Sequence, residues 1–137
     1  MFVVENYSSN GFACPITVLS NKEAGDFAEH FFEFKKNQPE IADQALGTNC
    51  HLLFPSLCEI ARRPAVLDAV EQAIGSNILL WSAGFFIKYP NTKSFVSWHQ
   101  DSTYWGLEPQ DIVTAWVAFS PSNLENGCMQ VVPGSHL

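Results

Sequence analysis

The spacing of apolar residues changes at about residue 77, and this change constrains the fold more than any other feature. Before it, apolar residues recur at helical intervals; after it, apolar, aromatic and β-branched residues form runs bounded by turn-forming residues. Runs of the second kind are typical of strands. The expected strands are NILLWSAGFFIKY (77–89), FVSWHQD (95–101), DIVTAWVAFS (111–120) and CMQVVPGS (128–135). Helices followed by strands, with no helix between the strands, predict an α+β fold with an antiparallel sheet, sandwich or barrel at its C-terminal end.

Helices are expected in the part of the chain before this change. Ser20 and Glu23 have the spacing of a capping box, and apolar residues follow them at helical intervals. Pro64 suits the first turn of a later helix, and Gly75 suits the position just past its end. The expected helices span 21–36, 56–62 and the stretch from Pro64 to Gly75.

Length and composition indicate one globular domain. The chain has 137 residues, of which 47% are hydrophobic and 15% are charged, so a packed core is expected and disorder is not. No repeat or domain boundary is visible. We therefore predict a single domain over 1–137, with a helical part to about residue 76 and a β part from about 77 to 137.

Charge and cysteine usage exclude several classes of partner. The net charge is −7, from 14 acidic against 7 basic residues, and no basic stripe is present. This composition disfavours binding to nucleic acid and to anionic membrane surfaces. The four cysteines form no CxxC pair, and neither a signal peptide nor an apolar run of membrane-spanning length is visible. These features predict a cytoplasmic protein with reduced thiols.

The segment FVSWHQDSTYW (95–105) holds the densest cluster of polar and aromatic residues. Residues two apart on a strand point to the same face, so His99 and Asp101 would project together. An imidazole and a carboxylate that converge could bind a divalent metal, as in the facial triad of non-haem Fe(II) oxygenases. A simple hydrogen-bonded surface pair is the alternative. A zinc hydrolase is disfavoured, because no HExxH-like helix accompanies the pair.

Three segments carry a resemblance to a known family. FFIKYPNTKSFVSWHQDSTYW, DIVTAWVAFS and NGCMQVVPGSH resemble, in order and spacing, the phytanoyl-CoA dioxygenase family of Fe(II)- and 2-oxoglutarate-dependent oxygenases. The resemblance covers roughly residues 45–137. It implies N-terminal helices packed on a partial double-stranded β-helix (a cupin-like jelly roll). It also implies Fe(II), 2-oxoglutarate and O2 as cofactor and cosubstrates, and hydroxylation of a small organic molecule.

The resemblance assigns roles to individual residues. It implies that His99 and Asp101 are catalytic iron ligands, and the presence of Asp101 favours hydroxylation over halogenation. The other implied site residues are Trp116, Phe85 and His51 for cofactor binding, and Tyr104 and Trp105 for substrate binding. For each of these five residues, ordinary packing in the fold is the alternative interpretation.

Part of the family's site is not found among these residues. The second iron-binding His and the Arg that pairs with 2-oxoglutarate are expected beyond residue 137, together with the C-terminal strands of the jelly roll. His136 is a poor third ligand, because it follows a Pro-Gly turn. We therefore expect a fragment that is inactive alone, with a non-catalytic jelly-roll binding module as the alternative. The absence of a Lys or Arg run disfavours an acyl-CoA substrate, and the sequence predicts no oligomeric state.

Overall fold

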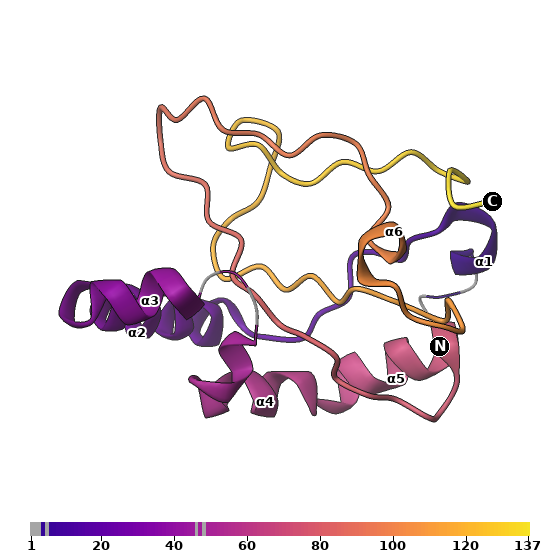
Figure 1. The fold of residues 1–137 in the computed structure, drawn as a ribbon, viewed down its shortest axis with the longest axis horizontal. Helices are drawn as coiled ribbons and strands as arrows, with labels where there is room; N and C mark the ends of the chain where they lie inside the picture. The colour runs from indigo at the N-terminus through magenta and orange to yellow at the C-terminus, as the bar shows by residue number, and fades with distance from the viewer. Residues whose placement is uncertain (1–3, 5, 46, 48) are drawn as a thin grey trace.

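The computed structural model describes residues 4, 6–45, 47 and 49–137. Its elements are α1 (Tyr7–Asn10), α2 (Asn21–Asn37), α3 (Pro39–Ala45), the 3-10 helix η1 (Cys50–Leu52), α4 (Pro55–Ala61), α5 (Pro64–Ile74) and α6 (Ser102–Trp105). The helices α2 to α5 gather along one side of the molecule, and the chain after α5 forms long irregular loops along the other (Figure 1). None of the described helices is long and apolar enough to cross a membrane.

The predicted sheet is wrong for this structure. The described residues contain no strand, so neither the α+β class nor the partial double-stranded β-helix (jelly roll) is present, and residues 77–137 do not form a β part. Alternating apolar residues favour extended backbone, but a strand also needs backbone N–H and C=O partners on a neighbouring strand. Many backbone hydrogen bonds here close turns instead, as between Thr92 N and Tyr89 O and between Cys128 N and Asn123 O.

The predicted helix over 21–36 is confirmed as α2. Ser20 accepts a hydrogen bond from the Glu23 N–H at 3.2 Å, and the Glu23 carboxylate accepts one from the Ser20 N–H at 2.8 Å. This reciprocal pair satisfies two backbone donors that a helix start otherwise leaves free. As predicted, α2 ends before Pro39, at Asn37. A further helix that was not predicted, α3, begins at Pro39, because proline is well tolerated at a first helical position.

The two later helices are also confirmed. Both α4 and α5 begin at a proline, and Gly75 follows α5 with φ of +85° while its N–H donates to the Glu71 carbonyl. These start and stop signals depend on neighbouring residues alone, so the sequence contains all that is needed to predict them.

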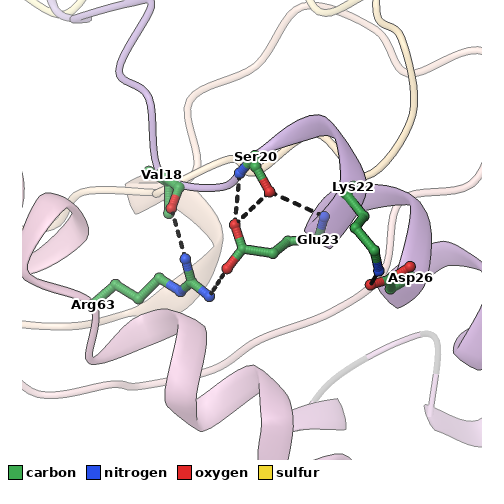
Figure 2. A network of polar contacts seen from close by, with 6 residues as sticks. All are labelled: Val18, Ser20, Lys22, Glu23, Asp26 and Arg63. Carbon is green, nitrogen blue, oxygen red and sulfur yellow. Dashed lines mark hydrogen bonds and ion pairs between the residues drawn. The ribbon is translucent and has the colours of Figure 1, made fainter.

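An ion pair joins the start of α5 to the start of α2. Arg63 donates to the Glu23 carboxylate at 2.6 Å and to the Val18 carbonyl at 3.0 Å (Figure 2). The hydrogen bonds from Arg63 and from Ser20 lower the pKa of Glu23 to about 2. One carboxylate therefore takes part in the cap of α2 and ties the start of α5 to the start of α2.

The core is small and aromatic. Phe31 of α2, Cys50 of η1 and Phe54 are buried together. Phe85 packs against them, with its ring centroid 4.2 Å from that of Phe31 and 5.6 Å, edge-on, from that of Phe54. Such aromatic pairs each add about 0.5–1.5 kcal/mol beyond the burial of area. With the hydrogen bond from Cys50 N to Ala83 O at 2.9 Å, this packing anchors the loop segment that runs on toward His99.

Candidate functional site

His99 and Asp101 lie in contact. The distance between His99 Nε2 and Asp101 Oδ1 is 3.1 Å, and the two side chains are 35% and 39% exposed. No strand brings them together: the chain bends at Trp98 and turns at Asp101, the residue before α6. The convergence expected from strand geometry is therefore present in a different backbone conformation.

The protonation of His99 follows from its hydrogen bonds. His99 Nδ1 lies 2.7 Å from the Ser97 carbonyl oxygen, which can only accept, so Nδ1 carries a proton. In the neutral ring, Nε2 then directs a lone pair toward the Asp101 carboxylate. Two acceptors at this separation need a positive charge between them. The Ser97 carbonyl, followed by the Asp101 carboxylate, raises the pKa of His99 above its ordinary value. The space between the two atoms thus favours a positive charge.

A third residue contacts this pair from a different segment. Thr114 Oγ1 donates a hydrogen bond to Asp101 Oδ2 at 2.6 Å, so the other carboxylate oxygen is the one that faces His99. Thr114 is not among the site residues predicted from the sequence. One feature of the sequence could have indicated it: Thr114 lies two residues before Trp116, a predicted site residue, in the run DIVTAWVAFS. Residues at that spacing in an extended chain point to the same side.

The pair opens into a hollow of about 330 Å³. Its lining residues are Val96, Ser97, His99, Asp101, Tyr104 and Trp105. The edge of the Tyr104 ring approaches the His99 ring, with 6.0 Å between the centroids, and Tyr104 is 74% exposed. The structure thus brings four of the predicted site residues together at one open, aromatic hollow.

The three residues predicted to bind the cofactor lie outside the lining of this hollow. Phe85 packs in the aromatic core, and Trp116 is 44% exposed on the segment that carries Thr114. His51 lies in η1, and its Nδ1 is buried with no hydrogen-bond partner in the described structure. Their roles at a cosubstrate stay predictions.

His136 is held elsewhere by its own contacts. Its Nε2 donates to the Ser8 carbonyl at 3.0 Å, and its ring packs against Gly11. In the part of the chain that the structure describes, no three His, Cys, Asp or Glu side chains gather as a metal site. Of the predicted and considered ligands, His99 and Asp101 thus lie together, and His136 does not join them.

Comparisons with known proteins point to one family. The model of the phytanoyl-CoA dioxygenase (PhyH) family matches residues 7–137. Phytanoyl-CoA dioxygenase domain-containing protein 1 of Rattus norvegicus is 31% identical over 115 residues, which cover 80% of this chain and 39% of that protein. A probable phytanoyl-CoA dioxygenase of Caenorhabditis elegans is 35% identical over 89 residues, which cover 60% of this chain and 28% of that protein. No solved structure matches the chain significantly.

Proposed function

Because this chain belongs to the phytanoyl-CoA dioxygenase family, we propose that the protein is an Fe(II)- and 2-oxoglutarate-dependent oxygenase that hydroxylates a small organic molecule. The family resemblance of the sequence motifs is confirmed, and it extends to residue 7 rather than to about residue 45. The aligned part is 39% of the length of the rat relative, so the activity is proposed for the whole protein. A third iron ligand and an anchor for the cosubstrate would come from outside these 137 residues.

The contact between His99 and Asp101 carries this proposal. An imidazole nitrogen and a carboxylate oxygen are two members of the donor set that non-haem Fe(II) oxygenases use. The hydrogen bond from Nδ1 to the Ser97 carbonyl leaves Nε2 as the ligand atom, and outer contacts of this kind orient most metal-binding histidines. The two residues therefore fit an Fe(II) ion, which would supply the positive charge that their facing acceptors require.

The residues around the pair would shape the reaction. When bound, Fe(II) with 2-oxoglutarate and O2 would supply the oxidation, in which the cosubstrate is converted to succinate and CO2. Tyr104 and Trp105 line the hollow beside the pair, where their rings would hold the substrate and exclude water. Trp116 is proposed to contact the cosubstrate, and Phe85 and His51 to support its pocket.

The hollow also restricts the class of substrate. The hollow is open to solvent, and no Lys or Arg is among its lining residues. The chain carries a net charge of −7, which repels polyanions. We therefore propose a neutral or cationic substrate rather than an acyl-CoA thioester.

Turnover by the full-length protein tests the proposal. With iron, 2-oxoglutarate and a panel of small molecules, the wild type should release succinate in step with a hydroxylated product, detected by mass spectrometry. The variants His99→Ala and Asp101→Ala should each lose at least about a hundredfold in turnover, because removing a metal ligand costs more than removing an outer-shell contact. His30→Ala, which removes an exposed histidine of α2, is the matched control. Unchanged turnover in both site variants would reject the assignment.

A further inference from the structure

The two carboxylate oxygens of Asp101 have different partners, and Thr114 contacts one of them. Its hydroxyl lies 2.6 Å from Asp101 Oδ2, while Asp101 Oδ1 lies 3.1 Å from His99 Nε2. A carboxylate accepts and does not donate, so the hydroxyl proton points at Oδ2. At this length the bond is of the strong, charge-assisted kind.

We propose that Thr114 is a positioning residue, which orients the Asp101 carboxylate so that Oδ1 faces the ligand nitrogen of His99. Rotation about the Cβ–Cγ bond of an aspartate is soft, so a carboxylate held only at one end would turn freely. Threonine suits this task because its branched Cβ restricts χ1 and keeps the hydroxyl in place. The inference rests on the proposed function, in which Oδ1 binds iron.

The surroundings of the bond favour orientation over simple stability. Asp101 is only partly buried and Thr114 is exposed, so neither group needs a protein partner to replace lost water. The bond instead joins two segments that are 13 residues apart. Trp116 follows two residues after Thr114, so the same bond holds the segment of the proposed cosubstrate contact beside the metal pair.

Two substitutions separate the hydroxyl from the shape of the side chain. Thr114→Val removes the donor and keeps the branching, whereas Thr114→Ser keeps the donor. In the full-length protein with 2-oxoglutarate, we expect Thr114→Val to weaken Mn(II) binding about tenfold, as measured by electron paramagnetic resonance. Thr114→Ser should bind Mn(II) nearly as the wild type does. Thr92→Val is the control, since it removes a hydroxyl bond to a backbone carbonyl at an exposed turn.

A second readout needs no metal. The carboxyl carbon of Asp101 should change its ¹³C chemical shift in Thr114→Val and keep it in Thr92→Val. If the wild type binds Mn(II) and Thr114→Val binds it equally well, the inference on Thr114 is overturned while the proposed function stands. If the wild type binds no Mn(II), the proposed function fails. An unchanged Asp101 shift in Thr114→Val then overturns the positioning role as well, and an altered shift supports it.

Discussion

At position 11, both the backbone conformation and the space available favour glycine over a residue with a side chain. The φ of Gly11 is +80°, and a Cβ atom there would lie 2.5 Å from His136 Nδ1. The absent side chain thus leaves room for the ring that donates to the Ser8 carbonyl. With the bond from Gly134 N to Asn10 O at 3.0 Å, this contact fastens the PGSH segment to α1, near the chain end in Figure 1.

We expect Gly11→Ala to lower the free energy of unfolding by about 1–2 kcal/mol, the cost of a left-handed conformation for a residue with a Cβ, and to displace His136. Urea unfolding measures the change. Gly25→Ala is the control with the opposite sign: Gly25 lies within α2 with open space around it, so alanine should stabilise the helix by about 0.5–1 kcal/mol. Equal effects of the two substitutions would contradict this account of Gly11.

Some residues of the site can be predicted from the sequence and others cannot, for a physical reason. His99 and Asp101 were found because they are close in the chain and chemically distinctive. Thr114 was missed, because a threonine in an apolar run is common and its contact with Asp101 depends on how two loops meet. The contact between the Ser97 carbonyl and His99 could not be predicted either, because every residue has a backbone oxygen and nothing in the sequence marks this one.

At the scale of elements, the Glu23 carboxylate makes the contact between the starts of α2 and α5 sensitive to acid. Its pKa falls from an ordinary 4.5 to about 2 in the folded protein, because Arg63 and Ser20 donate hydrogen bonds to it. A depressed folded-state pKa stabilises the fold above the unfolded value, and this contribution is lost as the pH falls toward the folded value.

Glu23→Gln should therefore reduce stability most above pH ~5, with the difference from wild type shrinking as the pH falls toward ~2. Urea unfolding at several pH values measures this. Asp26→Asn is the matched control, since Asp26 also belongs to α2 and pairs with Lys22 at 2.6 Å on an exposed face, where ion pairs contribute little. A Glu23→Gln deficit that stays constant with pH would show that the ion pair is not the cause.

Helices could be predicted from the sequence and strands could not, because helix signals are local and strand pairing is not. A capping box or an initial proline acts within one turn of helix, so its sequence signal is complete. A strand is defined by its partner, and the segments 77–89 and 111–120 find no ladder partner in the described structure. Their β-branched composition predicts extended backbone and cannot by itself predict pairing.

At the scale of the whole molecule, burial is uneven. Among the residues whose burial the structure describes, the buried apolar ones are Phe31, Ala42, Cys50, Phe54, Ile60 and Val66. All of them precede residue 77, whereas large side chains of the later loops are exposed, such as Leu79 and Phe95, both at 81%. The composition predicted a packed core, and the structure has a small one among its helices. Which apolar residues are buried depends on long-range packing, which composition does not specify. His99 and Asp101 thus lie on loops that are anchored to the helical core at Phe85 and to α1 at Gly134.

We propose that this acidic chain binds metal at His99 and Asp101 rather than at the carboxylates elsewhere on its surface. Paramagnetic broadening by Mn(II) in the ¹H–¹⁵N spectrum locates the ion directly. We predict that substoichiometric Mn(II) broadens the amide signals of residues 96–105 and of Thr114, spares those of α3 with its exposed Glu40 and Asp43, and has no such local effect in Asp101→Ala. Broadening spread over the acidic surface, or unaffected by Asp101→Ala, would contradict the account.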